Sequence, residues 1–176
     1  GSPAVVMGWV ARRRDLGSLI FLDVRDRTGI VQVVFNRETV PEAHARAEEL
    51  RSEYVVAIEG EVVRRDPATF NPSIPTGEVE IKATRLYILN DARTPPFPVE
   101  EEASVAEETR LRYRFVDLRR PGMQANLQLR HGIAMEIRRY MGEKGFLEIE
   151  TPFLTRSTPE GARDYLVPSR IHPGKF

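Results

Sequence analysis

The chain has 176 residues, of which 41% are hydrophobic and 30% are charged, and its 26 basic and 26 acidic residues give a formal net charge of zero. This composition allows a real hydrophobic core and lacks the strongly basic balance of a nonspecific nucleic-acid binder. No apolar run reaches the roughly 18 residues of a membrane-spanning helix, so we expect no membrane partner. Cysteine is absent, which fits a reducing compartment, and the three widely spaced histidines predict no metal site.

Five segments in the first 90 residues show the period-2 alternation of apolar and polar residues that is typical of β-strands. Gly8, inside the first of them, predicts a bulge or bend. Between the third and the fourth, the period changes to that of a helix. There Thr39 and Glu42 fit a capping box with Thr39 as the N-cap residue, and Pro41 is tolerated in the first turn. The strands are predicted at 5–14, 19–24, 30–35, 54–65 and 78–89.

Three strands, one helix and two strands follow one another in the order of an OB-fold. That fold is a five-stranded Greek-key barrel that commonly binds oligonucleotides on the face of its second and third strands. Another small β-barrel, or a meander with one helix, is the alternative. The place of the helix between strands three and four favours the OB-fold, and so do strand lengths that suit closure. We therefore predict a mainly β fold with α, whose barrel occupies residues 1–92.

The composition of the chain changes after the predicted barrel. Residues 90–99 are rich in proline and residues 100–108 are acidic, which together mark a domain boundary. Beyond it we predict helices at 107–119 and 123–144, the second ending near Gly145, and a short strand at 146–150. One strand cannot bury the apolar face of the long helix, so this second domain is expected to be incomplete. The apolar face consists of Leu129, Ile133, Ile137, Tyr140 and Met141.

Side chains suited to bind a nucleobase fall on the outer face of the predicted barrel. Parity places Phe21 outward in the second strand and, with a turn near residues 26–27, close to Gln32 of the third. An exposed Phe is a platform for base stacking, and a Gln amide can read a Watson–Crick edge. Glu80 shares the outer face of the fifth strand and can accept from a base amino group. The arginine run at 12–14 offers guanidinium groups to phosphate or guanine.

Each of these residues also has a simpler interpretation. Phe21 can pack under a loop, Gln32 and Glu80 can be ordinary exposed strand residues, and the arginines can form surface ion pairs with nearby aspartates. Their combination on one face is what favours nucleic-acid binding. Farther along, Glu160 and Arg163 lie in a loop that suggests a lid over a ligand, with a surface turn as the alternative. The sequence shows no catalytic triad, no phosphate-cradling Gly-rich loop and no paired acid and base.

Three stretches carry a resemblance that covers nearly the whole chain. They are GWVARRRDLGSLIFLDVRDRTGIVQVVF, RLRYRFVDLRRPGM and GFLEIETPFLTRSTPEGARDYLVPSR. They resemble bacterial-type aspartyl-tRNA synthetases, and the run TPEGARDYLVPSR separates them from the related lysine and asparagine enzymes. The resemblance implies a class II synthetase with an OB-fold anticodon-binding domain at 1–92 and a hinge at 93–120. The incomplete start of an α+β catalytic domain, built on an antiparallel sheet, would follow at 121–176.

The resemblance also implies roles for individual residues of the barrel. Phe21 matches the residue that stacks on the central uridine of the GUC anticodon of aspartate tRNA, and Gln32 matches a residue that reads an anticodon base. Leu16 resembles the version of the family that prefers aspartate tRNA over asparagine tRNA. The remaining anticodon contacts correspond to Arg14, Arg65 and Glu80.

Beyond the hinge, the resemblance implies two further sites. The helix at 123–144 and the residues up to Pro152 resemble class II motif 1, which builds the homodimer interface. Glu160 matches a mobile loop that closes on bound aspartate and meets its ammonium group. The expected interface residues are Leu129, Ile133, Ile137 and Pro152.

The parent enzyme would activate L-aspartate with ATP and Mg²⁺ and then esterify it to tRNA in the cytoplasm. The family's motifs 2 and 3 are not in these residues. We therefore expect a fragment that is inactive by itself and that binds no ATP or Mg²⁺. Its expected function is anticodon recognition as part of an aspartate–tRNA ligase. The alternative is a free-standing OB protein that holds single-stranded nucleic acid without sequence preference.

Overall fold

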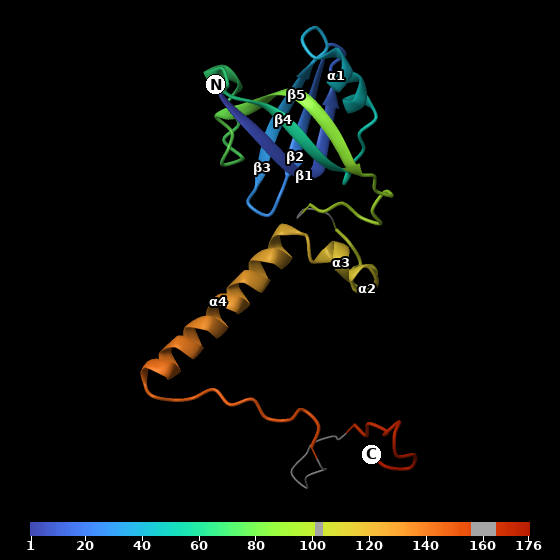
Figure 1. Cartoon of the computed structure of the whole chain (residues 1–176), viewed down its shortest axis with the longest axis vertical. Helices are drawn as coiled ribbons and strands as arrows, with labels where there is room; N and C mark the ends of the chain where they lie inside the picture. Colours follow the sequence, from blue (N-terminus) through green and yellow to red (C-terminus); the bar gives the residue numbers. More distant parts are fainter. Residues whose placement is uncertain (101–103, 156–164) are drawn as a thin grey trace. The chain divides into compact units, whose positions relative to one another are not determined.

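The computed structural model describes residues 1–100, 104–155 and 165–176 (Figure 1). The chain divides into two compact units, Gly1–Pro121 and Gly122–Phe176. The first unit contains a β-barrel and the connector that follows it, which we define as residues 91–120. The second unit contains one long helix and an irregular tail.

The barrel consists of five strands in the closed order β1-β2-β3-β5-β4, with β4 pairing back onto β1. The pairs are antiparallel except for β3 and β5, which run parallel. This arrangement confirms the predicted five-stranded OB-type barrel, with the helix α1 between the third and fourth strands. The strands are β1 Ser2–Asp15, β2 Leu19–Arg25, β3 Ile30–Asn36, β4 Val55–Arg64 and β5 Val79–Asn90.

Alternation along the strands builds the core. Ile20, Leu22 and Val24 of β2 are at most 3% exposed, whereas the residues between them face outward. Val33 and Phe35 of β3 are fully buried and lie directly beside Leu22 and Ile20 in the adjacent strand. The predicted parity of both strands is therefore correct. Burial of each such aliphatic or aromatic side chain stabilises the fold by about 1.5–3 kcal/mol.

Gly8 is required by a close approach of two strands. A Cβ atom at Gly8 would lie 2.4 Å from the carbonyl oxygen of Arg25 on β2, nearer than any real Cβ contact. The register shift of β1 against β2 occurs farther along, between Val10 and Arg12. Gly8 therefore permits tight strand packing, and the predicted irregularity of β1 lies two residues beyond it.

Helix α1, Pro41–Glu48, covers one end of the barrel (Figure 1). The predicted capping box is wrong: the N-cap residue is Val40, and no side chain caps the helix. Thr39 instead donates its hydroxyl to the carbonyl oxygen of Asn36 at 3.4 Å. Asn36 also accepts from the backbone N–H of Val40 at 2.9 Å, so the turn after β3 is organised around Asn36. A short 3₁₀ turn at Pro67–Thr69 interrupts the loop between β4 and β5.

The predicted helix at 107–119 is present as two short helices, α2 at Glu107–Arg112 and α3 at Arg114–Asp117. They are separated at Tyr113, whose φ of −111° and ψ of 47° leave the helical region. The connector has a small apolar cluster of its own, made of Phe97, Val99 and Val116. It therefore folds back on itself, where the sequence predicted a stiff hinge followed by one continuous helix.

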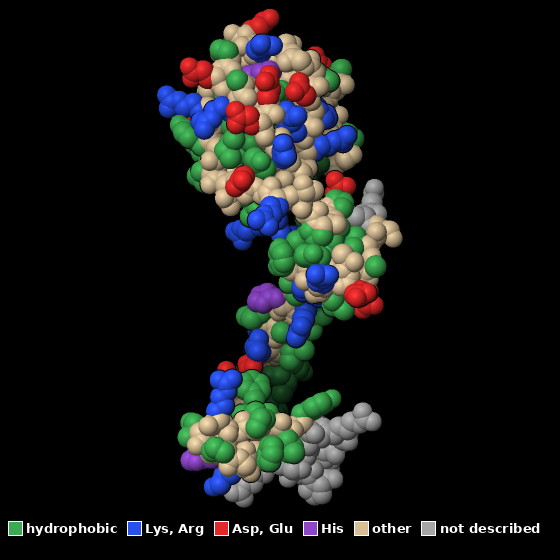
Figure 2. Space-filling view, turned by 90° about the vertical axis from the view of Figure 1, so that its right-hand side faces the viewer, with side chains coloured by type: hydrophobic (Ala, Val, Ile, Leu, Met, Phe, Trp, Pro, Cys, Tyr) green, Lys and Arg blue, Asp and Glu red, His purple; other side chains and the backbone are tan. Residues whose placement is uncertain are grey.

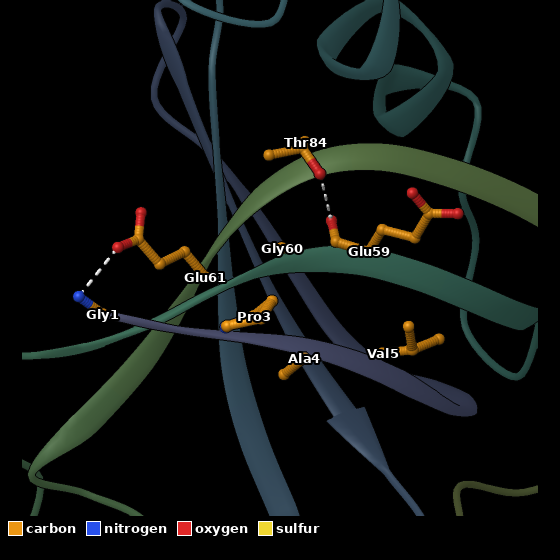
Figure 3. Close-up of a pocket in the computed structure, with 8 residues that line it drawn as sticks. All are labelled: Gly1, Pro3, Ala4, Val5, Glu59, Gly60, Glu61 and Thr84. Carbon is orange, nitrogen blue, oxygen red and sulfur yellow. Dashed lines mark hydrogen bonds and ion pairs between the residues drawn. The ribbon is translucent and has the colours of Figure 1, made fainter.

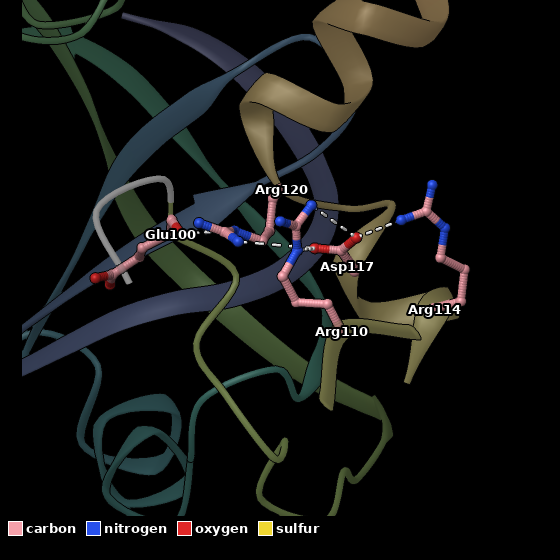
Figure 4. Close-up of polar contacts among 5 residues, drawn as sticks. All are labelled: Glu100, Arg110, Arg114, Asp117 and Arg120. Atoms are coloured by element: carbon pink, nitrogen blue, oxygen red, sulfur yellow. Dashed lines mark hydrogen bonds and ion pairs between the residues drawn. The ribbon is translucent and has the colours of Figure 1, made fainter. Parts of the chain in front are cut away.

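The side chain of Asp117 is fully buried at the centre of the connector (Figure 4). It accepts from Arg110 Nε at 2.8 Å and from Arg114 Nη1 at 2.7 Å, and Arg120 Nη1 lies 3.7 Å away. Arg120 also donates its Nε to the carbonyl oxygen of Glu100 at 3.2 Å. These bonds join the segment before α2 to both short helices.

Helix α4 occupies Pro121–Glu143, so it starts two residues before the predicted position. A proline suits the first turn of a helix, because its missing N–H would have no intrahelical partner there. Gly145 ends the helix with a φ of 83°, and the N–H of Phe146 bonds to the carbonyl oxygen of Met141 at 3.0 Å. The strand predicted at 146–150 is wrong: this segment is irregular, with no strand beside it in the described residues to complete a ladder.

Most of the surface of α4 is exposed. Leu129, Ile133 and Ile137 are 63%, 53% and 58% exposed, and no residue of the helix is buried. Within the described ranges, no helix combines the length and the hydropathy needed to cross a membrane.

Candidate nucleic-acid interface

The predicted base-binding residues of the barrel meet on one outer surface. Strand pairing places Phe21 opposite Val34 and Asp23 opposite Gln32. Phe21 and Gln32 therefore lie on the same face as diagonal neighbours, because Gln32 is two residues away from Val34, the residue directly opposite Phe21. We call the surface formed by Arg14, Phe21, Asp23, Gln32, Arg65 and Glu80 the polar face.

Gln32 lies at the centre of the polar face. Its Oε1 accepts from Arg14 Nη2 at 2.8 Å, and its Nε2 donates to Glu80 Oε2 at 2.9 Å. Arginine has only donors and a carboxylate has only acceptors, so these two neighbours fix which way the amide points. Gln32 keeps one N–H and one carbonyl lone pair, a donor beside an acceptor, for a further partner.

Gln32 is only 4% exposed, although its side chain is on the outer face of the barrel. The residues that cover it come from other strands, because Arg14 belongs to β1 and Glu80 to β5. A base that reaches the Gln32 amide must therefore displace one of these two side chains. The Arg14 side chain, 43% exposed, has the greater freedom to move.

Arg14 links Gln32 to the aromatic platform. Its guanidinium lies 5.4 Å from the centre of the Phe21 ring, and its Nη2 is 3.4 Å from Asp23 Oδ1. The ion pair expected for the arginine run is therefore present, and the same guanidinium lies beside the aromatic ring of Phe21. In this arrangement the Arg14 guanidinium occupies the Phe21 ring face, where an incoming base would stack on the ring or on the guanidinium itself.

Arg65, just after β4, closes the polar face on the other side. Its Nε lies 3.8 Å from Glu80 Oε2, and the two side chains are 11% and 20% exposed. Along the face the charges alternate, from Asp23 through Arg14 to Glu80 and Arg65, and they sum to zero. An uncharged base with donors and acceptors suits such a surface better than a phosphate group does.

The other two arginines of the predicted run do not belong to the polar face. Arg13 donates to the carbonyl oxygen of Glu48 at 2.8 Å and lies 3.5 Å from Asp15, so it attaches the end of α1 to β1. Arg12 is exposed. Leu16, in the turn after β1, is 71% exposed.

The turn between β2 and β3 sets the register that brings Phe21 and Gln32 onto one face. The side chain of Asp26 accepts from the hydroxyl and the N–H of Thr28 at 2.6 and 2.7 Å, and from the N–H of Gly29 at 3.1 Å. These bonds, led by that from the Thr28 hydroxyl, hold the pKa of the Asp26 carboxyl below its usual value. The charged form of Asp26 therefore favours this turn.

Asp23 is a further member of the polar face, and the ion pair expected between the arginine run and the nearby aspartates is present between Arg14 and Asp23. Its alternation with Phe21 in β2 is the signal that marks it as a member. The other predicted functional residues lie outside the polar face. Glu160 is outside the described residues, and the motif 1 residues of the second unit are all exposed: Leu129, Ile133, Ile137 and Pro152.

An open groove on the barrel surface lies over the paired strands β1 and β4 and is also lined by Thr84 of β5 (Figure 3). Glu59 and Glu61 line it, and Glu61 pairs with the N-terminal amino group of Gly1 at 2.9 Å. The groove has no aromatic lining residue, and its two carboxylates repel phosphate. On the face seen in Figure 2, acidic and basic side chains are interspersed over the barrel, so no single-sign patch points to another nucleic-acid surface there.

Comparison with known proteins matches both parts of the chain. Residues 4–89 match the model of the OB-fold nucleic acid binding domain, and residues 106–176 match that of the class II tRNA synthetases (D, K and N). The aspartate–tRNA(Asp/Asn) ligase of a Geobacillus species is 59% identical over the whole chain. The aspartate–tRNA ligase of Geobacillus kaustophilus is 58% identical over the same length. The chain spans 30% of the length of each.

A solved structure agrees with these matches. The asparaginyl-tRNA synthetase of Pyrococcus horikoshii, complexed with asparaginyl-adenylate, has a TM-score of 0.79 and 28% identity over 92% of this chain and 36% of its own. The polar face lies within the part of the chain that matches the OB-fold model. The chain belongs to the class II tRNA synthetases of the D, K and N group, of which it contains the OB-fold nucleic-acid-binding domain and part of the synthetase domain.

Proposed function

We propose that the polar face reads the anticodon of aspartate tRNA, and that the chain is the anticodon-binding part of an aspartate–tRNA ligase. The observation that carries this proposal is the pair of bonds that fixes the Gln32 amide between Arg14 and Glu80. A surface for nonspecific RNA binding needs charge and stacking but no fixed amide. A surface that distinguishes bases needs donors and acceptors held in set directions.

In this proposal, Phe21 stacks on the central uridine and Gln32 reads a base edge with its remaining donor and acceptor. Uracil offers such an edge, since its N3–H and a neighbouring carbonyl oxygen complement a Gln amide. Arg14 moves away from the Phe21 ring, Asp23 and Gln32 toward the RNA, which frees the Gln32 carbonyl oxygen for the base, while the bond from Gln32 Nε2 to Glu80 keeps the amide oriented. Arg65 and Glu80 supply the remaining contacts.

The parent ligase would use ATP and Mg²⁺ to activate L-aspartate and would then transfer it to tRNA. ATP is a substrate of the complete enzyme, and Mg²⁺ would accompany its phosphates. In the described part of the chain, no cluster of three acidic, histidine or cysteine side chains is arranged to hold a metal ion. Glu160 would meet the ammonium group of aspartate. Cytoplasmic location follows from this role in protein synthesis.

We also propose that α4 forms a homodimer interface in the parent enzyme. Its exposed apolar stripe, with Leu129, Ile133 and Ile137 spaced four residues apart, needs a partner surface in water. Pro152, which follows the helix, would belong to the same interface.

Anticodon specificity is tested directly by gel-shift titration of the chain with anticodon stem–loop RNAs. We expect the loop with GUC to bind about 5- to 150-fold more tightly than loops with one anticodon base changed, because one lost base contact costs about 1–3 kcal/mol. Equal affinity for all the loops would instead identify an OB protein without sequence preference. A loop changed outside the anticodon is the matched control and is expected to bind like the GUC loop.

A further inference from the structure

Glu53, in the turn before β4, combines two unusual features. It has a φ of 68°, a left-handed conformation that no other non-glycine residue adopts in the described part of the chain. Its side chain is also 5% exposed, which is rare for a carboxylate unless it is paired. A buried charge in a costly backbone conformation is retained only when the surrounding contacts determine it.

Those contacts come from two different parts of the first unit. Arg25, at the end of β2, donates from Nη2 to both carboxylate oxygens of Glu53 at 2.8 and 2.9 Å. Arg119, in the connector, places its Nη2 2.6 Å from Oε2 of the same carboxylate. The N–H of Glu53 bonds to the carbonyl oxygen of Val10 at 2.8 Å, so the backbone is held by β1 as well.

Arg119 has a second contact on the barrel. Its guanidinium lies 4.8 Å from the centre of the Trp9 ring on β1. Trp9 is the register partner of Arg25, so the aromatic ring and both members of the ion pair surround one point on the barrel wall. Arg119 of the connector therefore forms an ion pair with Glu53 and a cation–π contact with Trp9.

We propose that Trp9, Arg25, Glu53 and Arg119 form a latch that holds the connector in one orientation on the barrel. The latch is next to the polar face along β2, because Arg25 shares the outer face of that strand with Phe21 and Asp23. On the other side, Arg119 is two residues before the start of α4. The latch therefore ties β2, which contributes Phe21 and Asp23 to the polar face, to the last residues of the connector. If the polar face reads an anticodon, the latch fixes how the connector leaves the domain that reads it.

Two features of the sequence make this proposal testable. The chain has no cysteine, so spin labels attach only where cysteines are introduced, and Trp9 is its one tryptophan. We would label Lys82→Cys on β5 and Arg112→Cys on α2, both exposed positions, and measure the distance distribution between the labels by pulsed EPR without RNA. The latch predicts a narrow distribution, and Arg119→Ala is expected to broaden it and to shift Trp9 emission to longer wavelength.

Glu53→Asn is the complementary change, because asparagine tolerates the left-handed conformation but lacks the negative charge that pairs with both arginines. It is expected to broaden the distribution as Arg119→Ala does, and Arg27→Ala, in the exposed turn after β2, is expected to change nothing. An unchanged, narrow distribution in Arg119→Ala would overturn the latch.

The latch proposal and the proposal that the polar face reads an anticodon can be disproved independently of each other. Since the distance is measured without RNA, a chain that ignores the anticodon still reports on the latch. Arg119→Ala is expected to bind the GUC stem–loop within about twofold of the parent, a change of about 0.4 kcal/mol. A loss of affinity as large as that of a polar-face variant would place Arg119 on the RNA surface and would also overturn the proposal.

Discussion

The orientation of the Gln32 amide depends on two side chains of opposite hydrogen-bonding character. If Glu80 is lost, the amide keeps only the bond from Arg14, and its buried Nε2 group has no acceptor from β5. Leaving a buried donor unsatisfied costs about 1–3 kcal/mol. The orientation of the amide is therefore a property of three strands together, since Arg14, Gln32 and Glu80 come from β1, β3 and β5.

Phe21 is the residue whose replacement most simply tests stacking. We expect Phe21→Ala to weaken binding of the GUC stem–loop by about 1–3 kcal/mol, because a base loses its aromatic partner. Fluorescence anisotropy with labelled RNA measures the change. Tyr87→Ala is the control, since Tyr87 is an exposed aromatic residue on β5 that hydrogen-bonds Glu59 away from the polar face. Unaltered affinity in Phe21→Ala would assign the ring to packing under Arg14.

Parity and residue type predict several members of the polar face, but they do not predict how those members contact one another. Phe21, Gln32 and Glu80 could be placed on outer faces from alternation alone. The burial of Gln32 could not, because it depends on side chains brought in by strands far away in the sequence. Glu53 was missed for the same reason: a glutamate before a strand carries no sign of its left-handed backbone or of its two arginine partners.

At the level of elements, period-2 patterns predicted all five strands of the barrel to within a few residues. The predictions that fail concern segments whose structure depends on contacts with another segment. The capping box predicted at Thr39 does not form, because hydrogen bonds to Asn36 organise the turn before α1. The segment at 146–150 has strand-like alternation, but no strand lies beside it in the described residues. Local propensity does not report whether the partner is present.

The connector depends on the charged form of Asp117. The bond from Arg110, together with the nearby Arg114 and Arg120, holds the pKa of this carboxyl below its ordinary value of 3.8. A lowered folded-state pKa means that the stabilisation is complete well above pH 3.8 and is lost as the pH falls through the folded-state pKa. We expect Asp117→Asn to destabilise the first unit by about 1.5–3 kcal/mol at neutral pH, from lost charged hydrogen bonds.

Urea unfolding at a series of pH values measures this dependence. The difference in the free energy of unfolding between the parent chain and Asp117→Asn is expected to shrink below pH 3.8, because Asp117, once protonated, is uncharged like the asparagine of the variant. Asp91→Asn, at an exposed connector carboxylate, is expected to show no such difference. A constant difference down to the lowest pH would show that packing, and not charge, explains the effect.

Helix α4 makes a prediction of its own. Ile133→Asp puts a charge in the middle of the exposed apolar stripe, and we expect it to weaken self-association at least about tenfold in sedimentation equilibrium, or about 1.4 kcal/mol. Gln124→Asp adds the same charge on the opposite side of the helix, given 3.6 residues per turn, and is expected to leave association unchanged. A parent chain that stays monomeric at high concentration would contradict the proposed interface.

For the molecule as a whole, the neutral charge and the locally balanced polar face point to the same mode of binding. With 26 charges of each sign, the chain has no net field to attract a polyanion, so affinity must come from shaped contacts. The resemblance in sequence extends through both units, and the comparisons agree that the chain spans 30% of the ligases it matches. Tertiary structure adds what the sequence lacks: the fixed amide at the centre of the face, and the buried carboxylate that ties the connector to the barrel.

A cycle of protein and RNA changes tests whether Gln32 reads a base. Affinities of the parent chain and of Gln32→Ala are measured for the GUC stem–loop and for loops changed at each anticodon position. We expect the parent chain to discriminate by about 1–3 kcal/mol at every position, and Gln32→Ala to lose this discrimination at one position while keeping it at the others. If Gln32→Ala still discriminates at all three positions, Gln32 does not read a base.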